Sequence, residues 1–340
     1  MEFVLSSYHS QEVVQKIAGI ASVDYNIDCD EAILKLPEKM GEGEIRAVHF
    51  NDGVKLLTFN CTLYEMMSIE YENSECVPLR LIYCSLGEVV HSMGENGQYQ
   101  LNTYMGSIAC AKCDEVERFR FPSNIPLLIT IIQIDRAKYI NKIECNLPDL
   151  PEQFSKLLSD VDGEVSFLHQ SNYSYVISES LDTMNQCEHT GMVRRIFLES
   201  KTLEVLSMQI NQYDDDMNFE GKRVLLKQYD VDKIVKARDI LVEDIQDSPK
   251  ITDLARLAGI NQQKLKQGFK LVFGTTINRY LRNYRMSKAK ILLLEGSFNI
   301  GEISEKVGYS NASHFSKCFK EKYGVQPKEY AKKVMTEITT

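Results

Sequence analysis

The feature that most constrains this chain is an internal repeat in its last third. Residues 254–260, Leu-Ala-Arg-Leu-Ala-Gly-Ile, align with residues 303–309, Ile-Ser-Glu-Lys-Val-Gly-Tyr, and the match continues for about fifteen residues with one insertion in the second copy. Each copy has the pattern of a short amphipathic helix, a tight turn at Gly259 or Gly308, and a second helix with its own apolar face. Glycine suits the turn because it adopts positive φ without steric cost. Two copies of this pattern predict two helix-turn-helix elements.

The segment between the copies, residues 276–295, reads as one helix of about 20 residues. At 1.5 Å per residue such a helix is about 30 Å long. That length is close to the roughly 34 Å between successive major-groove faces on one side of B-DNA. One subunit is therefore expected to read two adjacent major grooves of double-stranded DNA.

The charge of the chain is uneven along its length. The whole chain of 340 residues carries a formal charge of −9, with 39 Lys/Arg and 48 Asp/Glu. Residues 230–340 contain 20 Lys/Arg and 13 Asp/Glu, a net of +7, which leaves 19 against 35, or −16, for residues 1–229. A basic tail on an acidic body favours a polyanionic partner for the tail.

The second copy carries a resemblance to a known family. Residues 308–317 read Gly-Tyr-Ser-Asn-Ala-Ser-His-Phe-Ser-Lys, followed by Phe319-Lys320, Tyr323-Gly324 and, at residues 327–330, Pro-Lys-Glu-Tyr. This pattern resembles the DNA-binding domain of AraC/XylS transcription regulators and covers residues 230–335. The resemblance implies a sequence-specific regulator that binds double-stranded DNA, forms a homodimer, responds to a small-molecule effector and contacts RNA polymerase.

The family's DNA-contacting positions can be carried over to both second helices. Amide side chains can bridge adenine N6 and N7, and lysine can donate to guanine O6 and N7. The base-reading candidates are Gln262, Gln263, Lys266, Gln267, Asn311, Ser313, His314 and Lys317. The phosphate-contact candidates are Lys270 and Lys320, with Arg279, Arg282, Arg285 and Lys288 along the joining helix, although such a charge run can also be only a solvated surface. Gly268 departs from the pattern, and we expect it to weaken the first recognition helix by about 1 kcal/mol relative to Ala.

The amino-terminal part predicts an α+β architecture. Residues 1–147 contain short apolar or alternating runs separated by turn residues, such as Asn51-Asp52-Gly53, which favours an antiparallel barrel or sandwich. This layout is similar to the cupin-like effector domains of AraC-type regulators. Residues 148–212 read as helices, with an apolar stripe at Ile196, Leu203 and Ile210 that suits either a dimer seam or packing on the β domain. We place a linker at residues 213–229.

Three further segments narrow the resemblance. Residues 41–46, 79–88 and 197–204 are similar to the subgroup that includes regulators of siderophore uptake. An effector-independent regulator, whose β domain serves only for dimerisation, stays open as an alternative.

An enzyme with a DNA-binding tail is the other alternative. The pair Cys110 and Cys113 is the only sequence feature that supports it. A structural zinc site needs four ligands, and His49, His91, His169 and His189 are isolated in the sequence. No P-loop, nucleophile elbow or dinucleotide fingerprint is present. We therefore expect no catalysis, no metal and no cofactor. The absence of a secretory signal and of a long apolar run predicts a cytoplasmic protein without a membrane partner.

Overall fold

The computed structural model of the chain divides into two compact units, Met1–Leu225 and Leu226–Thr340. It describes residues 1–331 except residues 6, 7, 9, 29, 73–77, 95–96, 173, 219–227 and 296. None of the described helices is long and apolar enough to cross a membrane.

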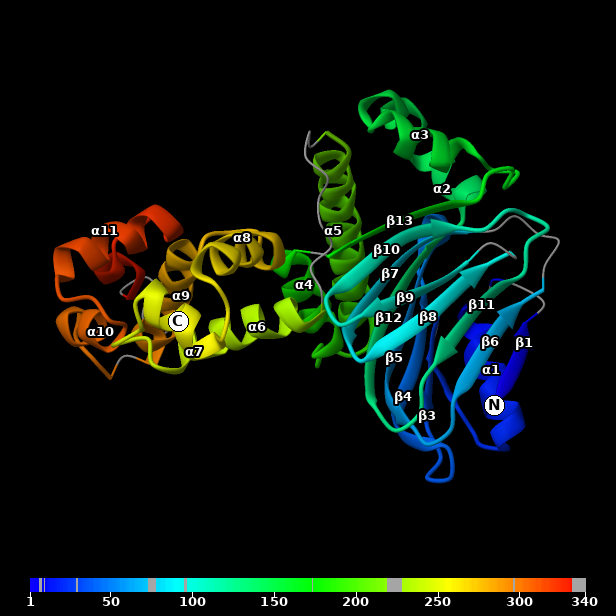
Figure 1. Cartoon of the computed structure of the whole chain (residues 1–340), viewed down its shortest axis with the longest axis horizontal. Coiled ribbons are helices and arrows are strands. Elements are labelled where there is room, and N and C mark those ends of the chain that lie inside the picture. Colours follow the sequence, from blue (N-terminus) through cyan, green and yellow to red (C-terminus); the bar gives the residue numbers. More distant parts are fainter. Residues whose placement is uncertain are drawn as a thin grey trace. The chain divides into compact units, whose positions relative to one another are not determined.

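The first unit is built on two β-sheets (Figure 1). Among the described residues, one sheet has five strands in the order β1-β6-β11-β8-β9, and the other has eight in the order β13-β10-β7-β12-β5-β4-β3-β2. The strands are β1 Glu2–Leu5, β2 Asn26–Asp28, β3 Glu31–Lys35, β4 Gly41–His49, β5 Val54–Leu63, β6 Met67–Tyr71, β7 Leu79–Leu86, β8 Glu88–Met93, β9 Gln98–Asn102, β10 Met105–Cys110, β11 Glu117–Phe121, β12 Pro126–Ile134 and β13 Phe167–Asn172. The predicted hairpin turn joins β4 to β5, with Asp52 and Gly53 at φ values of 59° and 81°.

The predicted cupin-like barrel is not confirmed, because the described strands form two open sheets. The larger sheet is buried on both faces. On β7, Ile82 and Cys84 face the core that the two sheets share with α1, whereas Leu81 and Tyr83 face a second core under the helices that follow. Strands buried on both faces lose the apolar–polar alternation that marks a barrel or a solvated sheet.

Helices cover the outer face of the larger sheet and form its second core. The helices of this unit are α1 Ser10–Ala21, α2 Arg136–Ile143, α3 Glu152–Ser159, α4 Tyr175–Asn185 and α5 Gly191–Asn218, with 3₁₀ segments η1 Asn51–Gly53 and η2 Glu144–Asp149. Two predicted boundaries need correction. The segment 148–212 contains a strand, β13, which pairs with β10. The predicted linker overlaps α5, since Tyr213 is buried and its hydroxyl donates to Gln153 Oε1 at 2.6 Å; residues 219–227 lie outside the described part.

The apolar stripe on α5 divides between two environments. Leu206 is buried in the second core, and Leu203 and Ile210 pack against it, so this stretch covers the chain's own sheet. Ile196, at the amino-terminal end, is 55% exposed, and its neighbours Met192 and Val193 are 76% and 60% exposed. Packing on the β domain therefore accounts for most of the stripe.

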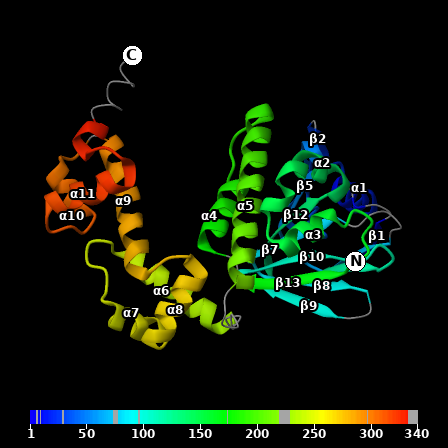
Figure 2. The same cartoon turned by 90° about the horizontal axis from the view of Figure 1, so that it is seen from above.

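The second unit is all helical and contains both predicted helix-turn-helix elements. Its helices are α6 Gln228–Glu243, α7 Ile251–Ala258, α8 Gln262–Phe273, α9 Ile277–Glu295, α10 Ile300–Lys306 and α11 Ala312–Tyr323. Figure 2 shows α9 running from the pair α7 and α8 to the pair α10 and α11. Ile277 and Tyr280 of α9 are buried on the first side, whereas Met286, Ala289 and Leu293 are buried in the core of the second element. Ile291 of α9 is 49% exposed.

Candidate nucleic-acid interface

The two recognition helices, α8 and α11, begin in the same way. Asn261 caps α8 by accepting hydrogen bonds from the backbone N–H groups of Gln263 and Lys264 at 2.8 and 3.4 Å. Asn311 caps α11 by accepting from Ser313 and His314 at 2.8 and 3.1 Å. Such a cap satisfies N–H groups that have no partner inside the helix. The repeat therefore includes the capping asparagine before each recognition helix.

One face of each recognition helix is buried in the core. On α8 the buried face includes Leu265 and Phe269, and on α11 it includes Phe315 and Phe319. Gly268 belongs to the buried face of α8, at the position that Cys318 occupies on α11. Gly268 therefore departs from the family pattern on the buried face of α8 and not on the exposed face that carries the predicted DNA contacts.

The opposite face of each helix is exposed, and it carries every predicted DNA contact that lies on α8 and α11. In Figure 1 both helices lie along one side of the second unit, with α7 and α10 along the other. Between Gln262 and Phe273 there is no acidic residue, and on α11 Glu321 is the sole carboxylate. The exposed predicted residues are Gln262, Gln263, Lys266, Gln267, Lys270, Asn311, Ser313, His314, Lys317 and Lys320.

Asn311 has a different role from the one the sequence suggested. It was expected to read bases, but its side-chain oxygen already accepts two backbone hydrogen bonds at the start of α11. The amide that would bridge adenine needs that oxygen as well as its NH₂ group. We therefore assign Asn311 to helix capping.

The capping role leads to a stability prediction. Asn311→Ala should lower the free energy of unfolding of the second unit by about 1 kcal/mol, because two backbone N–H groups lose their acceptor. Asn311→Asp keeps that acceptor and should retain most of the stability. Urea denaturation of both variants tests this; equal losses in the two would contradict the capping role.

The cations of α9 do not all face outward. Arg285 is half-buried and donates from Nε and Nη2 to the carbonyl oxygen of Ile245, at 2.9 and 2.6 Å. Its guanidinium also lies 5.7 Å from the centre of the Tyr309 ring. The expectation of a phosphate contact is wrong for Arg285, which ties the loop after α6 to the second element. Arg279, Arg282 and Lys288 are exposed.

Two lysines near the recognition helices were missed in the sequence. Lys264 lies on the exposed side of α8, and its Nζ is 2.7 Å from Asp230 Oδ2 of α6. The repeat could have revealed it, because Lys264 aligns with His314. Lys322 donates to the Asn283 carbonyl and to Ser287 Oγ, both at 2.8 Å, and so fastens α11 to α9.

The histidine and cysteine candidates of the first unit have partners within the fold. His91 lies 2.8 Å from Glu117 Oε1, and His169 lies 3.2 Å from Asp216 Oδ2. The Cys110 thiol donates to the Val165 carbonyl, and burial raises its pKa to about 11, so the thiolate form that reacts or binds metal is disfavoured at neutral pH. Within the described residues, no three His, Cys, Asp or Glu side chains are grouped so as to hold a metal ion.

Comparison with known proteins agrees with this geometry. Residues 254–333 match the model of a helix-turn-helix domain, and residues 42–222, more than half of the chain, match that of the regulatory protein PchR N-terminal domain. The chain belongs to the AraC family of transcription regulators. Its amino-terminal unit is of the PchR type.

Several relatives are similar over part of their length. The chain is 30% identical to the regulatory protein PchR of Pseudomonas aeruginosa over 52% of this chain and 56% of that protein. It is 28% identical to the transcriptional activator CsvR of Escherichia coli over 46% of this chain and 64% of that protein. The chain thus spans less than two thirds of either relative. Among solved structures, an AraC-type regulator from Chromobacterium violaceum is 25% identical over 30% of this chain and 91% of its own, with a TM-score of 0.29.

Proposed function

We propose that this chain is a sequence-specific DNA-binding regulator of transcription that inserts α8 and α11 into two adjacent major grooves. The observation that carries the proposal is the pair of capped helices joined by α9, each with a buried apolar face and an exposed polar face on which Glu321, near the carboxyl-terminal end of α11, is the sole carboxylate. The 19 residues of α9 span about 28 Å, close to one turn of B-DNA.

The proposal includes a division of labour along the recognition helices. Gln263 and Gln267 on α8, and Ser313 and Lys317 on α11, would contact bases, because they lie on the exposed faces near the amino-terminal halves of the helices. Lys270 and Lys320, in the last turns, would contact phosphates, which positions the protein without reading sequence.

A lysine substitution on α11 tests the function. Lys317→Ala should weaken binding to the operator by about 1–3 kcal/mol and relax preference at one base pair, because a base-edge donor is lost. Fluorescence anisotropy with the natural upstream sequence, with single-base variants and with random DNA gives the affinities.

The matched control is Lys306→Ala on α10, outside the recognition helices. Lys306 is exposed and its Nζ lies 4.4 Å from the centre of the Phe298 ring. Lys306→Ala should leave sequence preference unchanged. If Lys317→Ala weakens specific and random DNA equally, Lys317 contacts only phosphate. If the unmodified chain shows no sequence preference at all, the proposed function is wrong.

The proposal assigns regulation to the first unit. A small effector bound there would change how two subunits of a homodimer present their DNA-binding units, and the exposed apolar end of α5 with Met192, Val193 and Ile196 is available for subunit contact. RNA polymerase is a further partner in this proposal. The enzyme alternative loses part of its support, because the Cys110 thiol is buried and has a raised pKa.

A further inference from the structure

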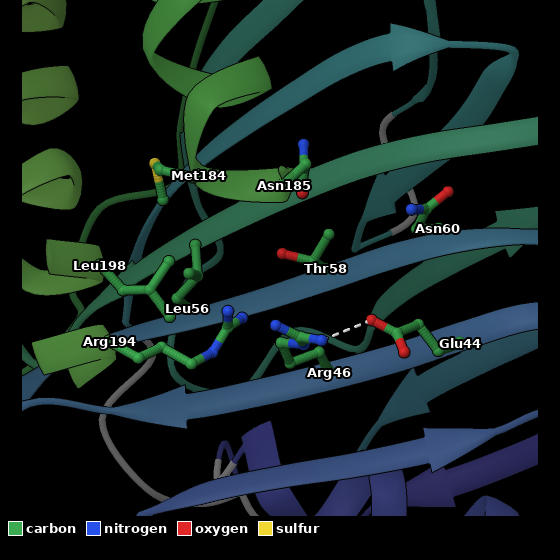
Figure 3. A pocket seen from close by; sticks show the side chains of 9 residues that line it. All are labelled: Glu44, Arg46, Leu56, Thr58, Asn60, Met184, Asn185, Arg194 and Leu198. Atoms are coloured by element: carbon green, nitrogen blue, oxygen red, sulfur yellow. Dashed lines mark hydrogen bonds and ion pairs between the residues drawn. The ribbon is translucent and has the colours of Figure 1, made fainter. Parts of the chain in front are cut away.

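The effector of the proposed function needs a site in the first unit, and the space between the two sheets is occupied. Side chains from both sheets and from α1 form one buried apolar cluster there, including Phe59, Phe119 and Phe121. A filled core leaves no room for a ligand. On the outer face of the larger sheet, the polar hollow between β4, β5, α4 and α5 (Figure 3) has a volume of about 20 Å³, which is room for about one water molecule.

A larger hollow lies beside the end of β12, where α2, η2, α3 and α5 surround it. Its volume is about 90 Å³. A single water molecule needs about 10–15 Å³, and a cavity of about 150 Å³ with apolar walls can hold a benzene molecule. By that comparison the hollow has room for a group of about four carbon atoms.

The walls of this hollow are apolar. Ile134 of β12, Phe154 and Leu158 of α3, and Leu206 of α5 are each at most 3% exposed. Because a buried water needs about two to four polar partners, walls of this kind are a poor site for water. Their carbon atoms lack neighbours on one side, and a hydrocarbon group in the hollow would supply the missing dispersion contacts.

Two lining residues carry polar groups, and neither brings a charge into the hollow. Burial raises the pKa of Tyr139, so its hydroxyl stays uncharged at neutral pH. Asn146 is exposed, and its Nδ2 donates to Asp149 Oδ2 at 3.4 Å. The hollow therefore reaches the surface beside Asn146, while its interior stays apolar.

The sequence explains why the hollow stays unfilled. Ile143, Asn146 and Leu150 all line it, so the segment from the end of α2 through η2 covers one side of the hollow. The middle position of that segment holds a polar residue whose side chain remains at the surface. η2, whose six residues the structure describes in full, contains Pro148 and has none of them buried. This covering segment therefore supplies no large apolar side chain at its centre.

The mouth of the hollow is acidic. Glu144 and Asp149 are exposed on η2, on either side of Asn146. The Nζ of Lys142, at the end of α2, lies 2.8 Å from Asp52 Oδ2, so this nearby cation is already paired. A negatively charged group at the mouth would be repelled by the two carboxylates.

We propose that this hollow binds the hydrocarbon end of a small molecule that carries no negative charge. About four carbon atoms would contact Phe154, Leu158 and Leu206, and the polar end would reach solvent beside Asn146. The proposal rests on the proposed function and names the chemical class of its effector. The ligand would contact α5, the described helix that precedes the DNA-binding unit in the chain.

The test uses 1-butanol as the probe and the full-length chain with ¹³C-labelled isoleucine δ1 methyl groups. Titration should shift the signals of Ile134 and Ile210, which line the hollow, to saturation with a Kd on the order of 10 mM. The signal of Ile45, which is buried between the two sheets, should stay unchanged. Absent or unsaturable shifts of Ile134 and Ile210 would overturn the proposal.

Related probes test the chemistry of the ligand. The Kd should fall about fourfold for each CH₂ group from ethanol to 1-butanol, and then level off because the hollow is full. 1,4-Butanediol must bury one hydroxyl without a partner and should bind at least about tenfold more weakly than 1-butanol. Butanoate should bind at least about threefold more weakly because the mouth is acidic. A Kd independent of chain length would contradict an apolar site, and butanoate binding as tight as that of 1-butanol would contradict the charge class.

Variants show whether the hollow is the site of binding. Ile210→Trp places a larger side chain in the hollow and should raise the Kd for 1-butanol at least about tenfold, because the free volume is lost. Ile20→Trp, at an isoleucine of α1 that is 62% exposed, is the matched control and should leave the Kd unchanged. Ile143→Phe provides a second filling variant should Ile210→Trp fail to fold. An unchanged Kd in the folded filling variants would show that the alcohol binds elsewhere.

The probe titration is independent of DNA. Anisotropy with operator DNA, measured without any alcohol, tests the proposed function by itself. Saturable shifts of Ile134 and Ile210 in a chain with no DNA preference would leave the site in place and remove the effector role. Sequence-specific DNA binding without such shifts would remove the site and leave the proposed function.

Discussion

Gly308→Ala should lower the free energy of unfolding of the second unit by about 2–5 kcal/mol and abolish sequence-specific DNA binding. Gly308 has a φ of 77°, where an L-residue costs about 1–2 kcal/mol. A Cβ at this position would also lie 2.3 Å from the Ile245 carbonyl oxygen and 2.6 Å from Arg285 Nη2. Relieving that overlap costs about a further 1–3 kcal/mol, because the loop after α6 and the arginine bonded to it must move.

The first copy of the repeat provides the control. Gly259 has nearly the same φ, 70°, but a Cβ there would come no closer than 3.8 Å to a neighbouring atom, Lys233 Nζ. Gly259→Ala should therefore cost about 1–2 kcal/mol, the backbone part alone. Urea denaturation of both full-length variants measures the difference. Equal losses in the free energy of unfolding would show that the close contact between Gly308 and the Ile245 loop does not contribute to the effect of the substitution.

Glu117→Ala should destabilise the first unit by about 3–5 kcal/mol, because it leaves a charged arginine unpaired in the protein interior. Arg80 and Glu117 are both 0% exposed, with Arg80 Nη2 3.1 Å from Glu117 Oε2 and His91 on the other carboxylate oxygen. The Arg80 guanidinium also lies 4.9 and 4.7 Å from the ring centres of Tyr8 and Tyr71.

Glu70→Ala is the matched control on the neighbouring strand β6. Glu70 pairs with Arg118 of β11, but both side chains reach the surface, at 22% and 34% exposure. Loss of an exposed pair costs at most about 1 kcal/mol. Urea denaturation monitored on the first unit should separate the two variants, and similar losses would contradict the importance of burial for the Arg80–Glu117 pair.

The same pair predicts a dependence of stability on pH. Burial acts to raise the pKa of Glu117, but the Arg80 guanidinium and the His91 hydrogen bond outweigh it and hold the pKa below its usual 4.5. A carboxyl whose pKa is lower in the folded state contributes stability above the unfolded value. That contribution should be complete above pH 4.5 and decline as the pH falls below it. Glu117→Gln should remove this part of the acid sensitivity, as followed by denaturation midpoints between pH 3 and 6.

The sequence by itself determined the DNA-binding unit. Glycine at the two turns, the 3.6-residue spacing of Leu265 and Phe269 or Phe315 and Phe319, and the length of the joining helix all depend on residues close together in the chain. A short sequence pattern is therefore enough to predict these features, and the repeat contains that pattern twice. The exposed faces of α8 and α11 followed because a helix that buries one side must expose the other.

Only the tertiary structure decided the roles that depend on distant partners. Asn311 was assigned to helix capping instead of base reading because its side chain accepts backbone hydrogen bonds. Arg285 was removed from the phosphate-contact candidates because it donates to the Ile245 carbonyl, forty residues away in the chain. The two open sheets depend on pairings such as β1 with β6 and β10 with β13, which join strands about sixty residues apart. Sequence periodicity reports which side of a strand is buried, but the partner that buries it is set by packing between segments that the chain order does not bring together.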